Sequence, residues 1–175
     1  ERDILLIIDE VQTGNGRTGT LYAFMQYNII PDIVTTAKGL AGGLPLGACM
    51  MGEKVEDTLS AGSHGSTFGG NPICAAGAVS ILSRIDDKLL DEVREKSVYI
   101  ISQLQSAKGV RSVSGLGLMI GIEIEKDAKE VAAECLKKGV IVLTAKTKIR
   151  LLPPLNIKMQ ELEQAITILK GVIAQ

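Results

Sequence analysis

The sequence predicts an α/β domain followed by a smaller α+β domain. Ile4–Ile8 and Ile33–Thr36 are apolar or β-branched runs typical of buried strands, and Leu21–Asn28 between them has helical spacing. A strand, a helix and a strand in this order form a right-handed crossover unit with parallel strands. Further along, Lys, Glu and Asp become frequent and short strands alternate with amphipathic helices. We therefore divide the chain into residues 1–85 and 86–175.

The elements expected in the first domain follow from local signals. Ile4–Ile8 is continuous and rich in β-branched residues, so we expect a strand buried on both faces. Asn71 as N-cap and Pro72 in the first turn begin a helix. The remaining elements are a third strand at Leu46–Met51, a short helix at Val55–Ala61, a polar loop at Gly62–Gly70, and the end of the last helix at Ile85.

The second domain is expected to mix helices with short strands. Its apolar residues recur at helical spacing in three segments, and compact β-branched runs lie between them. The helices are predicted over 86–108, Ala128–Lys138 and Met159–Ile173, and the strands over Val110–Val113, Met119–Glu125, Val140–Leu143 and Ile149–Leu152.

Composition narrows the possible partners. Lys and Arg number 19 against 20 Asp and Glu, so the net charge of −1 shows no electrostatic footprint for nucleic acid or an anionic membrane. The longest apolar run is far too short to span a bilayer. Three cysteines without a C-x-x-C pair favour neither a zinc site nor a disulfide framework, and indicate a reducing, cytoplasmic location. We expect a small molecule or another protein as partner.

The glycines of Gly14–Gly19 match the G-x-G-x-x-G spacing of a dinucleotide-binding loop. Asp9 and Glu10 precede them, where carboxylates would repel a phosphate, and no suitable acid lies about 20 residues beyond. A turn that needs positive φ angles is the better interpretation. A nucleotide-binding module that uses Gly14–Gly19 stays open as an alternative, as does a non-catalytic dimerisation fragment.

Asp9 and Lys38 follow neighbouring predicted strands and are the strongest candidates for chemistry. The carboxyl ends of parallel strands meet at one edge of a sheet, where ligands bind. Lys38 precedes Gly39, so a planar group could approach the backbone, and desolvation would lower the pKa of its amine. This pair suits a cofactor that needs a covalent amine on one side and an anion on the other.

Four motifs in order resemble the class III, pyridoxal-phosphate-dependent aminotransferases. The motifs are Asp9–Gly14 with Gly16–Gly19, Ala37-Lys38-Gly39, Gly65–Pro72 and Arg150–Leu155. The resemblance implies that residues 1–85 are the C-terminal part of a fold-type I large domain, with a mostly parallel sheet. It likewise implies that residues 86–175 are the small α+β C-terminal domain.

The resemblance also implies a role for each matching residue. Lys38 would bind pyridoxal phosphate covalently and move the substrate Cα proton, Asp9 would hold the pyridine nitrogen, and Gln12 would lie near the phenolic oxygen. Thr67, with Ser66 as a second candidate, would bind the cofactor phosphate from the neighbouring subunit, which implies a homodimer with a shared active site.

Outside the cofactor contacts, the resemblance implies that Arg150 binds a substrate carboxylate through its planar fork. The substrates would be an amino acid and a 2-oxo acid. His64, Glu10 and Arg17 are expected to be structural, with Glu10 and Arg17 either pairing with each other or capping the turn.

The resemblance covers only part of the family pattern. The chain begins without Met and almost directly in a strand, so we expect an N-terminal portion to be missing. Absent with it would be a phosphate loop, an aromatic residue stacked on the cofactor ring and an acidic residue near the substrate. We expect the 175-residue piece to have little or no activity alone.

Overall fold

The computed structural model describes residues 3–175 and divides them into two compact units. The first unit ends at Asp87, and the second is Lys88–Gln175. The sequence predicted a domain boundary after Ile85. Each unit has its own sheet.

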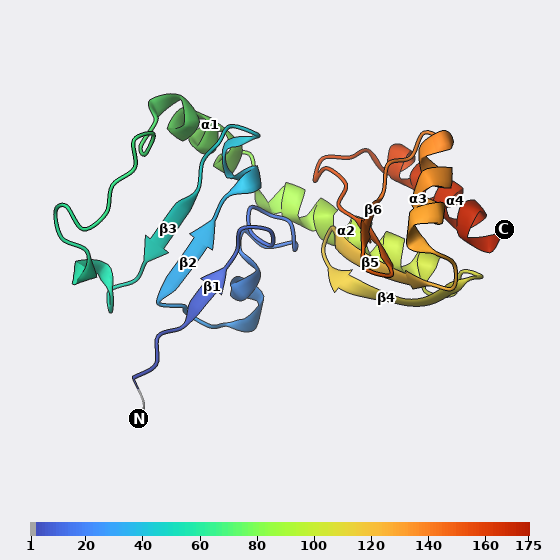
Figure 1. Cartoon of the computed structure of the whole chain (residues 1–175), viewed down its shortest axis with the longest axis horizontal. Coiled ribbons are helices and arrows are strands. Elements are labelled where there is room, and N and C mark those ends of the chain that lie inside the picture. Colours follow the sequence, from blue (N-terminus) through green and yellow to red (C-terminus); the bar gives the residue numbers. More distant parts are fainter. Residues whose placement is uncertain (1–2) are drawn as a thin grey trace. The chain divides into compact units, whose positions relative to one another are not determined.

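The first unit contains a three-stranded sheet in the order β1 (Ile7–Asp9), β2 (Ile33–Thr36), β3 (Ala48–Met51) (Figure 1). β1 and β2 are parallel, which confirms the predicted crossover unit, although the connecting helix is a short 3-10 helix, η1 (Ala23–Tyr27). β3 runs antiparallel to β2. The sheet is thus a parallel pair with an antiparallel edge strand, a common variation in mixed sheets.

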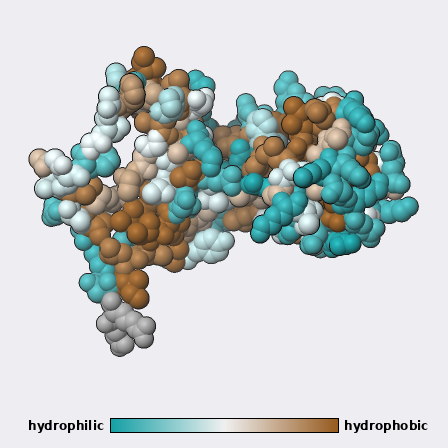
Figure 2. Space-filling model, viewed as in Figure 1, coloured by the Kyte–Doolittle hydropathy of each residue, from teal (hydrophilic) through white to brown (hydrophobic). Residues whose placement is uncertain are grey.

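The prediction that Ile4–Ile8 is a strand buried on both faces is wrong within this chain. The strand begins only at Ile7, and Ile4 and Ile7 are 73% and 60% exposed. β1 lies at the edge of the sheet, with β2 as its neighbour, and the described residues do not cover its apolar side chains. Figure 2 shows hydrophobic surface gathered over this part of the first unit.

The rest of the first unit has little regular structure before its one long helix. The predicted helix at Val55–Ala61 is a single 3-10 turn, η3 (Glu56–Thr58), and the polar segment after it is a loop as expected. α1 (Pro72–Leu82) begins where predicted, because the Asn71 side chain accepts hydrogen bonds from the Ile73 and Cys74 N–H groups at 3.0 and 3.2 Å.

The second unit packs helices against a four-stranded antiparallel sheet in the order β4-β5-β7-β6 (Figure 1). Its helices form the apolar core with β5 and β7, and core residues such as Ile122, Ile149 and Ile100 are completely buried. The elements are α2 (Asp87–Leu104), β4 (Val110–Leu116), β5 (Met119–Ile124), α3 (Ala128–Lys137), β6 (Leu143–Ala145), β7 (Lys148–Leu151) and α4 (Met159–Ala174).

One predicted strand of the second unit is displaced. Val140–Leu143 was expected as a strand, but β6 begins only at its last residue. Gly139 has a φ of 83°, and the Val140 N–H donates to the Cys135 carbonyl at 2.9 Å, so the first part of this segment closes the end of α3. Among residues 3–175 no helix is long and apolar enough to cross a membrane.

Candidate active site

The turn after β1 is built around Glu10, whose side chain is completely buried. Its carboxylate accepts hydrogen bonds from the Thr13 hydroxyl and, at 2.9 Å, from the Phe24 N–H. The Glu10 N–H donates to the Thr35 carbonyl at 2.8 Å. Glu10 therefore caps the turn, the second of the two structural roles expected from the sequence. Arg17 further along is half-buried, and this burial lowers the pKa of its guanidinium.

Asp9 ends β1 with one carboxylate oxygen engaged. Its Oδ1 accepts from the Val11 N–H at 2.9 Å and from the Thr35 hydroxyl at 3.3 Å. The side chain is exposed, and within residues 3–175 no group hydrogen-bonds Oδ2. One oxygen thus fixes the side chain while the other can face a ligand that carries a proton or a positive charge.

Lys38 is the first residue of a 3-10 helix, η2 (Lys38–Ala41), and has a φ of 51°. Left-handed backbone is uncommon for residues other than glycine and clusters at functional sites, where the surrounding structure holds it. The chain turns at once into η2, and Gly42 caps its C-terminal end. The Lys38 side chain is exposed, so the described residues do not desolvate it.

Asp9 and Lys38 lie at the same end of the parallel pair. Asp9 is paired with Thr35 across the two strands, and Lys38 follows Thr35 by three residues. With about 3.3 Å per residue and about 4.8 Å between strands, their Cα atoms are at most about 11 Å apart. A lysine side chain and one aromatic ring can bridge that distance. An open carboxylate oxygen and an exposed amine so placed fit a cofactor held covalently at one end and by an anion at the other.

The other residues predicted for the first unit are exposed. Gln12 lies in the turn that Glu10 caps. Ser66 and Thr67 lie in the loop before α1, and no hydrogen bond joins their side chains to the Asp9 and Lys38 turns among the described residues. His64 is exposed in the same loop.

Arg150 belongs to the second unit. It is half-buried on β7, paired with Gly121 of β5 and Leu143 of β6. It lines a cavity of about 650 Å³ whose other walls are mainly apolar side chains of the α3–β6 connection, the segment after β7, and α4. A guanidinium among apolar walls can bind a carboxylate tightly, because water competes less for it there.

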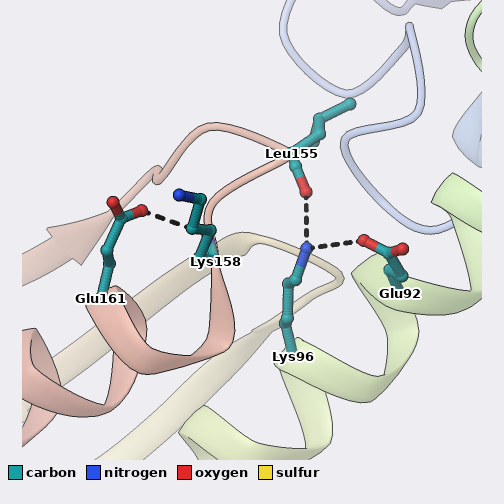
Figure 3. A network of polar contacts seen from close by, with 5 residues as sticks. All are labelled: Glu92, Lys96, Leu155, Lys158 and Glu161. Carbon is teal, nitrogen blue, oxygen red and sulfur yellow. Dashed lines mark hydrogen bonds and ion pairs between the residues drawn. The ribbon is translucent and has the colours of Figure 1, made fainter.

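A buried lysine holds the segment that follows β7, and it was not among the residues predicted from the sequence. Lys96 of α2 is 6% exposed, and its Nζ donates to the Leu155 carbonyl at 3.0 Å and to Glu92 Oε2 at 3.1 Å (Figure 3). Nearby, the Glu161 carboxylate accepts from the Lys158 N–H at 3.2 Å, where α4 begins. In the sequence, Glu92 and Lys96 form an ordinary i,i+4 pair, so nothing there marks Lys96 as buried.

Comparison with known proteins gives one consistent result. The family model described as Aminotransferase class-III matches residues 1–173. The acetylornithine aminotransferase of Haemophilus ducreyi is 52% identical over 176 residues, covering 99% of this chain and 45% of that protein. That of Aquifex aeolicus is 45% identical, with 99% and 46% covered. The chain thus spans about half the length of the curated relatives it matches.

Solved structures agree with the sequence relatives. The N-acetylornithine aminotransferase of Stenotrophomonas maltophilia matches with a TM-score of 0.87 at 34% identity, covering 98% of this chain and 47% of that one. The ornithine aminotransferase of Toxoplasma gondii matches with a TM-score of 0.91 at 33% identity, covering 98% and 43%. These likenesses confirm the predicted fold class.

Proposed function

The chain belongs to the class III aminotransferase family, and we propose that the whole protein is a pyridoxal-phosphate-dependent transaminase of arginine biosynthesis. It would transfer the amino group of N-acetylornithine to 2-oxoglutarate in a ping-pong cycle. The observation that carries the proposal is the placement of Asp9 and Lys38 at the same end of the adjacent strands β1 and β2, with Asp9 Oδ2 open and the amine exposed.

Each candidate residue has a chemical task in this proposal. Pyridoxal phosphate supplies the electron sink that stabilises negative charge at the substrate Cα. Asp9 Oδ2 would hold the proton on the pyridine nitrogen, because a charge-assisted hydrogen bond favours the cationic ring. The Lys38 amine would hold the cofactor covalently and would remove the Cα proton of the substrate. Arg150 orients the substrate by binding its carboxylate.

The remaining contacts extend the proposal beyond a single chain. Gln12 would lie beside the phenolic oxygen, while Thr67, with Ser66 as a second candidate, would bind the phosphate of the neighbouring subunit. The exposure of the Gly62–Gly70 loop supports such a role. We accordingly propose a cytoplasmic homodimer with a shared active site. In it residues 1–85 form part of the cofactor-binding domain and residues 86–175 form the small domain.

The amino donor is the most specific part of the proposal. Curated relatives named acetylornithine aminotransferase, at 40–52% identity, favour N-acetylornithine. Ornithine, 4-aminobutyrate and succinyl-diaminopimelate are the alternatives within the family. Comparing kcat/KM of the whole protein for the four donors tests this choice, and a preference for any of the other three would replace N-acetylornithine.

The cofactor assignment is tested on the whole protein with pyridoxal phosphate added. We expect an absorbance band of lysine-bound cofactor that Lys38→Ala abolishes together with transamination. Lys54→Ala is the matched control, since Lys54 is another lysine of the first unit and is paired with Asp3 at 2.6 Å. A wild type that never develops the band would disprove the proposal, and so would a band that survives Lys38→Ala.

The 175-residue chain alone should behave differently from the whole protein. We propose that it has little or no transaminase activity, because it spans less than half the length of its relatives. Substantial turnover by the chain with added pyridoxal phosphate, N-acetylornithine and 2-oxoglutarate would contradict this expectation.

A further inference from the structure

The Gly14–Gly19 segment resembles a phosphate-binding loop in spacing but is built differently. It leads to the 3-10 helix η1 instead of an α-helix, and Gly14, Gly16 and Gly19 are all buried. Gly14 is required sterically, since a Cβ there would lie 2.8 Å from the Glu10 carbonyl oxygen. The glycines therefore allow a tight turn, and their backbone is not open to a phosphate.

The turn holds Asn15 in a buried position. It is 7% exposed and has a φ of 56°, so the turn holds it in the left-handed region. Its Nδ2 donates to the Ala37 carbonyl at 3.1 Å and to Thr36 Oγ1 at 3.2 Å. A carbonyl can only accept, which fixes the nitrogen on that side of the amide. Asn15 thus donates hydrogen bonds to both of the residues directly before Lys38.

Thr36 and Ala37, which Asn15 binds, lead directly into the strained backbone of Lys38. Lys38 has its own φ of 51°, and such backbone persists where neighbouring groups determine it. The Ala37 carbonyl also accepts the Leu40 N–H at 3.1 Å, so Asn15 and η2 share one anchor. Thr36, the other partner, is 2% exposed, so its hydrogen bond with Asn15 is buried away from competing water, while the bond to the Ala37 carbonyl is partly buried.

Asn15 also carries a cost that a packing role does not explain. Its Oδ1 is buried, and within the described residues it has no hydrogen-bond partner. An unpaired buried oxygen is destabilising, and glycine would adopt the same positive φ without that oxygen if the turn were the only requirement. The donor end of the amide is therefore the part that the site requires.

We propose that Asn15 is a positioning residue that fixes the turn from which Lys38 directs its amine to the cofactor. The proposal rests on the proposed function. It goes beyond it by assigning the glycine-rich turn a task in the same site.

The first test follows cofactor capture by the whole protein. Asn15→Asp keeps the shape but replaces the donor with a carboxylate facing the Ala37 carbonyl. We expect formation of the lysine-bound cofactor band to slow about tenfold, the factor that losing one or two buried hydrogen bonds implies. Asn28→Asp is the matched control, because Asn28 is exposed and also has positive φ, 52°. Its rate should equal that of the wild type.

The second test needs no cofactor and separates this proposal from the proposed function. In the cofactor-free whole protein, amide hydrogen exchange of Leu40 should accelerate about tenfold in Asn15→Asp, while exchange in the second unit stays unchanged. If Asn15→Asp does not fold, Asn15→Gly replaces it in the test. This variant keeps the positive φ without the amide and should show the same two effects. Wild-type rates of capture and exchange in Asn15→Gly would overturn the proposal. Failure of the wild type to form the band would instead overturn the proposed function.

Discussion

The two units of the chain are stabilised by different means. The second unit buries a continuous core in which Ile100, Leu104, Leu118, Ile122 and Ile149 are fully inaccessible. Among its described residues, the first unit has a small cluster of Leu40, Ala41 and Ala78, and its turns are held instead by the buried polar groups of Glu10 and Asn15. All candidate site residues except Arg150 lie in this first unit. Most of the residues proposed for chemistry therefore lie in the unit where hydrogen bonds determine the local structure and few apolar side chains are buried.

The largest effect should come from separating the units. Residues 86–175 expressed alone should unfold in urea in one cooperative transition, with circular dichroism and tyrosine fluorescence coinciding, because their core is internal. Residues 1–87 alone should show no cooperative transition, since β1 and its flanking apolar residues are largely exposed. A cooperative transition of residues 1–87 with a urea midpoint similar to that of residues 86–175 would contradict the difference between the two units.

Matched truncations of isoleucine measure the same contrast within the 175-residue chain. Ile122 of β5 is fully buried, so Ile122→Ala should lower the free energy of unfolding of the second unit by about 2–5 kcal/mol. Ile7 of β1 is 60% exposed, so Ile7→Ala should change the free energy of unfolding of the first unit by less than about 0.5 kcal/mol. Urea titration gives both values, and equal losses would contradict the assignment of a thin core to the first unit.

Local sequence signals predicted the elements that local interactions determine. β2 has the predicted bounds, and α1 begins at Pro72 because Asn71 caps its own helix. The antiparallel direction of β3 and the exposure of Ile4–Ile8 were not predicted, since both depend on what lies beside the sheet. Val140 was misassigned because its hydrogen bond to Cys135 competes with strand formation.

The residues of the candidate site also fall into two groups, those that local signals or motifs select and those whose partners are distant in sequence. Asp9, Lys38 and Arg150 were selected by residue type at the end of an apolar run or by motif, and their roles stay predictions. The residues that support them could not be selected, because their partners are distant in sequence. Asn15 donates hydrogen bonds to residues 21 and 22 positions away, and Lys96 binds the carbonyl of a residue 59 positions away. Only the fold brings such partners together.

Removing a buried cation should have an intermediate effect. Lys96→Ala leaves the Leu155 carbonyl without its donor, so the free energy of unfolding of the second unit should fall by about 1–3 kcal/mol. Lys137→Ala is the control, because its pair with Glu134 is exposed on α3 and should contribute nothing measurable. Urea titration of the 175-residue chain checks both, and equal effects would show that Lys96 contributes no more than a surface charge.

The smallest expected effect is a pair of helix caps, one in each unit. Asn71 caps α1 with two hydrogen bonds, and Asp127 caps α3 by accepting from the Lys129 and Glu130 N–H groups at 2.8 and 3.1 Å. Either change to Ala removes about 0.5–2 kcal/mol of local stability. In α3, which packs on the core, Asp127→Ala should lower the urea midpoint of the whole second unit.

In α1 the loss should stay local, because Ile73 and Val79 are exposed and few core contacts tie this helix to the sheet. Asn71→Ala should therefore accelerate amide exchange in the first turns of α1 and leave the unfolding transition of the second unit unchanged. If both caps shift one common transition equally, the two units unfold as one, and the difference in their cores does not control stability.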